Sequence, residues 1–256
     1  MKNLKNSVLR SLKEHGIAII TSYYDEKFCN QAIVEMEDVM AKNKNKIQAY
    51  EGEGTSGDQR IFKLENQSKC ALKFKKDTFI SGILQDYAPH KIDSHFILGG
   101  KLESSNGKTK NSGGGWHRDS DNIQLKAMLY LKDVDAKNGP FLFIKESKLF
   151  DLQRRNFIAG TKMMSKIRTL LGKTITTPPR YKDETINEFL NKKNLAPFEV
   201  IGKAGDVVLF DSSFIHRGKN IEFGSRFTLT NYFYGANLRT RISMQRKFGK
   251  KFISKV

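Results

Sequence analysis

A His-X-Asp pair and a histidine far downstream must meet if they act together, and this requirement constrains the fold more than any other feature. A glycine run at 113–115 leads into Trp116-His117-Arg118-Asp119, and a second histidine, His216, follows 99 positions after His117. If this segment is extended, His117 and Asp119 lie on one face and their two neighbours on the other. We expect the chain to fold back so that His216 reaches the same face.

The residue types of this trio indicate a metal site. Two imidazoles and one carboxylate on one side of a metal ion form the facial triad of non-heme iron(II) oxygenases, which leaves positions open for a cosubstrate and oxygen. A His-X-Asp alone often arises by chance, and a lone histidine is usually structural. The full spacing, with Arg226 ten positions after His216 and strand-like sequence around each part, is much more specific. We therefore predict that His117, Asp119 and His216 bind iron(II).

Two further pairs are candidates for binding a cosubstrate. Arg226 and Thr228 alternate on a predicted strand, and an arginine beside a hydroxyl suits a bidentate grip on a carboxylate. Lys126 and Met128 share one face of the predicted strand that follows the ligand pair. We predict that they line a cosubstrate pocket; for Lys126, an ordinary surface position is the equal alternative.

Composition sets the class of protein. The chain has 256 residues, 38% of them hydrophobic, and 18 phenylalanines, which is enough for one large β domain with helical additions or for two small domains. Only Cys29 and Cys70 are present, so a disulfide framework is not expected and a reducing cytoplasm fits. No stretch approaches the ~20 apolar residues of a membrane span, and the N-terminus reads as an amphipathic segment rather than a signal core.

The net charge of +18 favours an anionic partner, which includes nucleic acid, membrane headgroups and anionic substrates. The lysines are nevertheless dispersed, with groups at 42–46, 73–76 and 247–255, so a solvated surface explains them at least as well as a binding patch. No recognisable nucleic-acid-binding module interleaves aromatic and basic residues. We expect a small-molecule substrate, for which an anionic group is one option, and we favour it over a nucleic acid partner.

Hydrophobic periodicity and turn residues predict many short strands with helices at the N-terminal end. One helix is expected at 5–15, where Gly16 ends it. A second is expected to begin after the N-cap Asp25, and a third at 79–87. Strands are expected at 17–20, 60–64, 95–102, 123–132, 141–144, 198–201, 206–210 and 227–234, with a basic surface helix or extension from 239. Asn138-Gly139 predicts a hairpin between two of these strands.

The segment 150–195 interrupts this pattern. It carries helical patterns at 150–171 and 185–191 around a Thr-Thr-Pro-Pro stretch. We interpret it as an insertion between strands, not a separate domain. Arg180 and Tyr181 make it a candidate lid and substrate-selecting surface, and an ordinary packed excursion is the alternative.

Short antiparallel strands behind N-terminal helices suggest a double-stranded β-helix, a jelly-roll or cupin-like barrel. The chain resembles the phytanoyl-CoA dioxygenase-like family of iron(II)/2-oxoglutarate-dependent oxygenases. The resemblance rests on 12–20, on Trp116-His117-Arg118-Asp119, on 129–141, on 205–210 leading into His216-Arg217-Gly218, and on Arg226. The family's Gly-Ser-His after the second strand reads Glu146-Ser147-Lys148 here, and the 150–195 insertion matches nothing in it.

The resemblance implies one domain over 1–256 that binds Fe(2+) through the trio. It also implies 2-oxoglutarate as cosubstrate, with its distal carboxylate at Arg226 and Thr228, and consumption of O2. The expected reaction hydroxylates a C–H bond of a small or medium-sized metabolite, for which an anionic group is one option, and releases succinate and CO2. The alternatives are a nucleic-acid demethylase of the same chemistry, a non-catalytic nucleic-acid-binding barrel, and a metal-binding barrel that would not need Arg226. The oligomeric state stays open.

Overall fold

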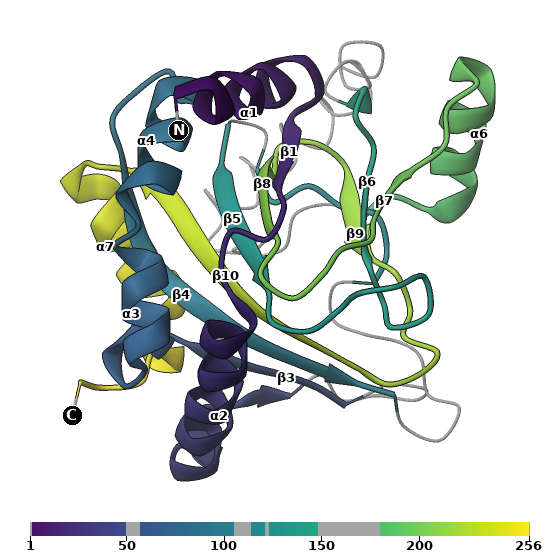
Figure 1. The fold of residues 1–256 in the computed structure, drawn as a ribbon. Coiled ribbons are helices and arrows are strands. Elements are labelled where there is room, and N and C mark those ends of the chain that lie inside the picture. The colour runs from purple at the N-terminus through teal and green to yellow at the C-terminus, as the bar shows by residue number, and fades with distance from the viewer. Residues whose placement is uncertain (1, 50–56, 105–113, 121–122, 148–179, 256) are drawn as a thin grey trace, which may run out of the picture.

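The computed structural model describes residues 2–49, 57–104, 114–120, 123–147 and 180–255. Two antiparallel sheets form its centre (Figure 1). The large sheet has the order β1 (Ile17–Ile20), β8 (Val207–Asp211), β5 (Leu125–Tyr130), β10 (Ser225–Gly235), β4 (Ile92–Glu103), β3 (Gly57–Phe62), β2 (Gln48–Ala49). The small sheet has the order β7 (Phe198–Val200), β6 (Phe141–Phe143), β9 (His216–Gly218).

Helices lie along one side of the large sheet (Figure 1). They are α1 (Lys2–His15), α2 (Glu26–Lys42), α3 (Lys69–Lys75) and α4 (Thr78–Tyr87). The C-terminal helix α7 (Leu238–Phe248) packs instead through Phe248 against Phe96 and Leu98, and α6 (Asp183–Lys193) lies beside the small sheet. Short 3-10 turns occur at η1 (Lys44–Lys46), η2 (Leu64–Asn66) and η4 (Gly249–Lys251). The predicted class, antiparallel sheets with helices, is confirmed. Closure of the two sheets into a jelly roll stays a prediction.

Strand alternation sorts β5 into two faces. Leu125, Ala127 and Leu129 belong to the main core with buried residues of the N-terminal helices. Met128 and Tyr130 belong instead to a second core between the two sheets, with Phe141 and other residues of the small sheet. This inner face is the one that carries Lys126, so the predicted cosubstrate face looks toward the small sheet.

The helix ends predicted near the N-terminus are confirmed. Gly16 ends α1 with a φ of +74°, a left-handed conformation that favours glycine, and β1 follows at once. Asp25 caps α2 by accepting a hydrogen bond from the backbone N–H of Phe28. The other predicted strands and helices of the described residues form, with ends that shift by a few residues, and the basic tail folds as α7. The exception is the extended strand expected at the ligand pair His117 and Asp119.

The predicted hairpin through Asn138-Gly139 is wrong. A turn does form there, because Gly139 has a φ of +76° and the Asn138 side chain bonds the backbone N–H of Asp135 at 2.9 Å. However, β5 pairs with β8 and β10, whereas β6 pairs with β7 and β9. The turn therefore carries the chain from the large sheet to the small one, and turn chemistry alone does not distinguish these outcomes.

The predicted insertion is described only from residue 180 onward, where α6 matches the expected helix at 185–191. The helix predicted at 150–171 lies outside the described residues. Within the parts of the chain that the structure describes, no helix has the length and apolar character needed to cross a bilayer.

Candidate metal centre

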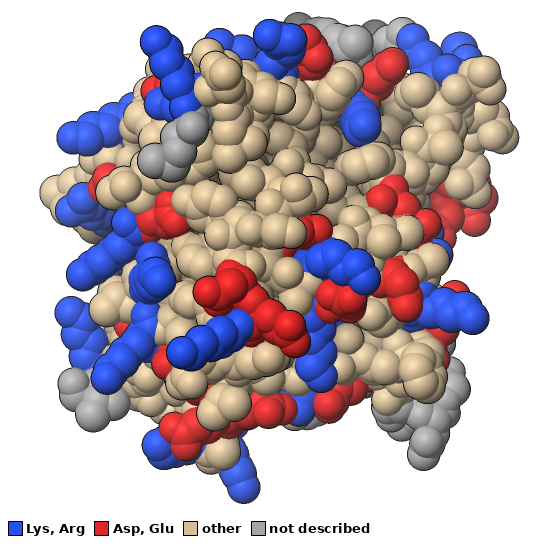
Figure 2. Space-filling view, in the orientation of Figure 1, with Lys and Arg blue, Asp and Glu red and all other residues tan. Residues whose placement is uncertain are grey.

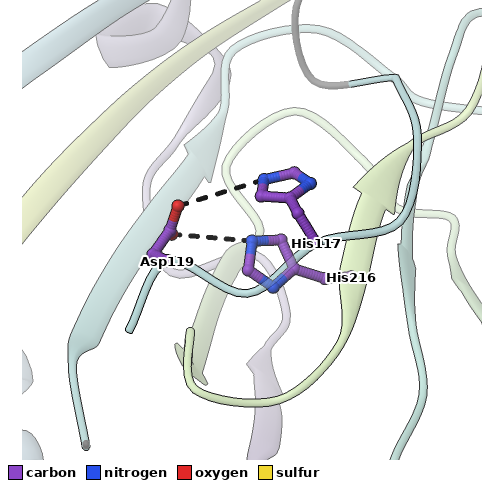
Figure 3. Close-up of side chains that lie close together, drawn as sticks. All are labelled: His117, Asp119 and His216. Atoms are coloured by element: carbon purple, nitrogen blue, oxygen red, sulfur yellow. Dashed lines mark ion pairs between the residues drawn. The ribbon is translucent and has the colours of Figure 1, made fainter. Parts of the chain in front are cut away.

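The three predicted ligands meet at one point (Figure 3). One potential ligand atom from each of His117, Asp119 and His216 lies within 4.8 Å of the others. The Asp119 carboxylate faces both rings, with Oδ1 at 3.9 Å from Nε2 of His117 and Oδ2 at 3.6 Å from Nε2 of His216. The fold thus brings together residues that the sequence separates by 99 positions.

Backbone hydrogen bonds join the two ligand segments directly. The N–H of His117 donates to the carbonyl of His216 at 3.0 Å, and the N–H of His216 donates to the carbonyl of His117 at 2.9 Å. This reciprocal pair forms an isolated antiparallel bridge. The Asp119 N–H donates to the carbonyl of Ser212 at 3.0 Å.

The ligand pair does not lie on a regular strand, which corrects the extended strand expected there. Only His117 takes part in a β-bridge, and Asp119 lies in a bend. The predicted facing still holds, because Trp116 and Arg118 are buried on the other side, where Trp116 packs with Leu142 and Ile215.

Both imidazoles present Nε2 to the centre because their other nitrogens are engaged. Nδ1 of His117 lies 2.9 Å from the carbonyl of Gly115, and Nδ1 of His216 lies 2.8 Å from the carbonyl of Phe214. Metal-binding histidines almost always donate the second ring N–H to such an acceptor, which fixes the tautomer and the ring orientation. Two oriented Nε2 atoms and one carboxylate fit the iron(II) donor set.

The charge states of two of these groups also fit. Burial and the neighbouring His216 lower the pKa of His117 to about 4, so its ring is neutral at pH 7. Burial raises the pKa of Asp119, but Lys126 and then the two histidines lower it more, so its pKa stays well below the usual range. A neutral imidazole and an ionised carboxylate are the forms that bind a metal.

Lys126 is buried, with 6% of its surface exposed, so the surface alternative is wrong. Its ammonium group pairs with Oδ2 of Asp119 and lies 4.4 Å from the centre of the Tyr232 ring. Burial lowers the pKa of Lys126, but Asp119 and Tyr232 raise it more, and the net shift is upward. Met128 lies two residues further along the same face of β5 and is also buried.

Arg226 and Thr228 lie toward the opposite end of the inner face, at the start of β10. A guanidinium N–H of Arg226 donates to the carbonyl of Gly139. Burial lowers the pKa of Arg226. The neighbouring Tyr130 and Asp58 raise this pKa, but the net shift is downward. A bound carboxylate would offset that cost of burying the cation.

Cross-strand register connects this end to the trio. On β10, Thr228, Thr230 and Tyr232 pair with Tyr130, Met128 and Lys126 of β5. In β4, Gly100 opposes Thr228, and a Cβ there would lie 2.9 Å from Thr228 Oγ1. A Cβ at Gly99 would instead meet Met36 and Leu64. Gly100 therefore leaves room beside Thr228, and Gly99 allows α2 to pack closely.

Ser147 is a residue whose role sequence reasoning missed. It is fully buried, and its Oγ accepts a hydrogen bond from the N–H of Ile215 at 2.7 Å, next to His216. Its carbonyl accepts a hydrogen bond from the Arg118 guanidinium at 2.6 Å, between the other two candidate ligands. Ser147 is thus hydrogen-bonded to both segments that carry the candidate ligands. The available signal was the serine that Glu146-Ser147-Lys148 shares with the family's Gly-Ser-His.

The described end of the insertion also reaches the site. Arg180 forms a β-bridge with His117, and its guanidinium donates to the carbonyl of Gly115 at 3.2 Å. The N–H of Tyr181 donates to the carbonyl of Trp116 at 2.8 Å. Both candidate lid residues therefore lie beside the ligand loop.

The family model for phytanoyl-CoA dioxygenase (PhyH) matches residues 12–222 of this chain. Solved structures with a similar fold include the epimerase SnoN from nogalamycin biosynthesis in complex with Fe3+, alpha ketoglutarate and nogalamycin RO. Its TM-score is 0.67 and its identity 12%, with 92% of this chain and 85% of that chain covered. The carbocyclase SnoK from the same biosynthesis gives a TM-score of 0.65, 15% identity and coverage of 92% and 86%.

EctD from S. alaskensis with bound Fe gives a TM-score of 0.63 and 15% identity, with 89% of this chain and 75% of that chain covered. At these identities the likeness is one of fold. No curated protein matches the chain.

Proposed function

Because this chain belongs to the phytanoyl-CoA dioxygenase family, we propose that it is an iron(II)- and 2-oxoglutarate-dependent oxygenase. The observation that carries the proposal is the convergence of His117, Asp119 and His216, with both Nε2 atoms turned toward one carboxylate. Similar structures contain iron or alpha ketoglutarate, which supports the same pair of cofactors here.

In this proposal each residue has a separate task. His117, Asp119 and His216 would hold iron(II) through two imidazole nitrogens and one carboxylate. Arg226 binds the distal carboxylate of 2-oxoglutarate and Thr228 assists, because both lie on the inner face of β10. Lys126 and Met128 line the cosubstrate pocket on the inner face of β5, between Arg226 and Asp119. When bound, the iron and the cosubstrate supply the oxidising chemistry, and the chain orients the reactants and excludes water.

The overall reaction is hydroxylation of a C–H bond in a small or medium-sized metabolite, with conversion of 2-oxoglutarate and O2 to succinate and CO2. The similar structures include an epimerase and a carbocyclase, so this fold accommodates other outcomes as well. We further propose that 1–256 forms one domain in a reducing cytoplasm. The insertion at 150–195 acts as its lid, which the position of Arg180 and Tyr181 beside Gly115 and Trp116 supports.

The experiment is an assay of succinate release and oxidised products. The purified chain is incubated with iron(II), 2-oxoglutarate and a metabolite extract, and mass spectrometry follows species heavier by about 16 Da, the mass of one oxygen atom. Iron-dependent succinate release is expected. Its absence under all conditions would favour the non-catalytic metal-binding barrel.

The charge of +18 keeps the nucleic-acid demethylase as the second candidate. On the face in Figure 2, lysine and arginine side chains are spread out, with acidic side chains between them. A duplex-binding protein would show log K falling with log salt by about 0.9 per neutralised phosphate. We expect only weak retention of oligonucleotides, lost at physiological salt. Tight binding there, or succinate release stimulated by nucleic acid, would favour the demethylase.

A further inference from the structure

A pocket of about 240 Å³ lies beside α7 and borders Asp119, one of the three candidate metal ligands. Its inner end is formed by Asp119 and Ser120, and its outer wall by Met244 and Lys247 of α7. The remaining lining residues come from the ends of β4, β5 and β10 and the segments beside them: Ala88, His90, Ile92, Ile123, Gln124, Leu125, Phe233, Tyr234, Gly235.

The pocket lies at one end of the large sheet. Ile92 begins β4, Leu125 begins β5, and Gly235 ends β10, so all three mark the same edge. Arg226 lies at the other end of β10. A molecule in the pocket would therefore meet the metal from the side opposite the proposed carboxylate anchor of the cosubstrate.

The lining has an apolar body and a cationic outer end. Ile92, Leu125 and Phe233 are apolar, and Gln124 donates to the hydroxyl of Tyr234 at 3.2 Å. Among the lining residues that the structure describes, Asp119 is the single acidic one, and it already pairs with Lys126. Lys247 thus supplies a positive charge at the end of the pocket away from the metal.

Charge along the C-terminal segment supports this polarity. From 223 to 256 the sequence has no aspartate or glutamate, and its basic residues are Arg226, Arg239, Arg241, Arg246, Lys247, Lys250, Lys251 and Lys255. Arg241 is compensated by Asp93 at 2.8 Å. Among the described residues, Lys247 forms no ion pair, and its ammonium group lies 5.1 Å from the centre of the Phe248 ring. Its ammonium group is available for a ligand.

We propose that this pocket is the substrate site and takes a small molecule with an apolar body and one anionic group, a carboxylate or a phosphate, bound by Lys247. This inference deepens the proposed function and rests on it for the reaction, but the binding can be measured separately. The volume lies below the roughly 300–1,000 Å³ of drug-sized sites, which favours a small metabolite.

The test measures binding without turnover. The full chain is loaded with 2-oxoglutarate and with zinc(II) as a redox-inert replacement for iron. Saturation-transfer NMR then compares carboxylic acids of four to eight carbons, such as hexanoate, with the matched alkyl phosphates, amides and amines. The acids or the phosphates are expected to bind about tenfold tighter than the amides, and the amines least. Equal binding of acids and amides, or no anionic binder in the panel, would overturn the proposal.

Lys247→Glu and Arg246→Glu form a matched pair, because they make the same charge change on adjacent exposed residues of α7 and only Lys247 lines the pocket. Lys247→Glu should weaken anion binding about tenfold or more, the effect of ~1.4 kcal/mol. Arg246→Glu should change it by less than about twofold, because a rim charge outside the pocket is largely screened. Equal losses would mean general attraction by the basic segment and would contradict the assignment.

Met244→Trp tests the location independently of charge. The larger side chain should fill the pocket and remove binding of acids and amides together, while circular dichroism checks that the variant is folded. Unchanged acid binding would show that the pocket is not the site. If anions bind through Lys247 but succinate is never released, the proposed function fails and the binding site stands. If succinate release depends on a neutral metabolite, the proposed function stands and the anionic substrate site is wrong.

Discussion

The two ends of the inner face are built in different ways. At one end, Arg226 and Thr228 belong to β10, which is hydrogen-bonded on both sides to β4 and β5. At the other end, Asp119 lies in a bend and His117 in an isolated bridge. The anchor for the cosubstrate is therefore positioned by a continuous sheet. Of the three metal ligands, only His216 begins a strand, β9, whereas His117 and Asp119 depend on a few individual hydrogen bonds. Substitutions at the two ends should separate these dependencies.

Asp119→Ala should have the largest effect, because it removes the carboxylate from the trio and leaves Lys126 buried without its partner. Tight iron binding and succinate release should both be lost, as measured by metal analysis of the dialysed protein and by 2-oxoglutarate turnover. Asp133→Ala is the control, since Asp133 is an exposed carboxylate paired with Lys203. Wild-type turnover in the Asp119 variant would disprove the ligand assignment.

Arg226→Gln should remove the carboxylate anchor at the sheet-held end and leave the metal ligands at the other end unaffected. Loss of a buried charge pair should weaken 2-oxoglutarate binding by about 2–5 kcal/mol, and iron binding should be unchanged. Arg226→Lys should also bind poorly, because an ammonium group cannot reproduce the planar guanidinium fork. Calorimetric titration of both variants with 2-oxoglutarate gives the measurement. Wild-type affinity in both would place the carboxylate anchor elsewhere.

Ser147→Ala should loosen the loop-held end alone. It removes the acceptor of the Ile215 N–H, at a cost of about 1–3 kcal/mol in the free energy of unfolding. Iron affinity should fall about 10- to 100-fold, as for other residues that orient metal ligands.

Ser213→Ala is the matched control for Ser147→Ala. Ser213 is also buried and close to His216, but among the described residues its Oγ has no hydrogen-bond partner. It should change urea denaturation and iron titration little. Equal effects of the two variants would remove the special role assigned to Ser147.

Gly100→Ala should give the smallest effect, at the sheet-held end. The added Cβ would lie 2.9 Å from Thr228 Oγ1, so this side chain must move, and we expect a loss of about 1 kcal/mol in 2-oxoglutarate affinity. Gly57→Ala on the neighbouring strand is the control, because its Cβ would make an ordinary contact at 3.5 Å with Glu103. An unchanged titration would show that Thr228 is not beside the cosubstrate.

The sequence predicted features that local chemistry determines. Gly16 and Asp25 mark helix ends by backbone geometry and capping, and the alternation along β5 placed Lys126 and Met128 on one face. The trio was predictable because two histidines and one aspartate at this spacing are typical of an iron(II) site. Partners chosen by tertiary packing were not predictable: Asn138-Gly139 gives a turn in either topology, and nothing local shows that Ser147 contacts Ile215.

The reciprocal hydrogen bonds between His117 and His216 also have a consequence for how the protein folds. Their formation closes a loop of about a hundred residues, and such long-range closure carries an entropic cost that local contacts do not. The metal site should therefore assemble late, after both sheets have formed, and metal binding should add its free energy to the native state alone. A rise in the thermal midpoint on adding iron(II) would then report the completed fold, and a chain truncated before β9 should show none.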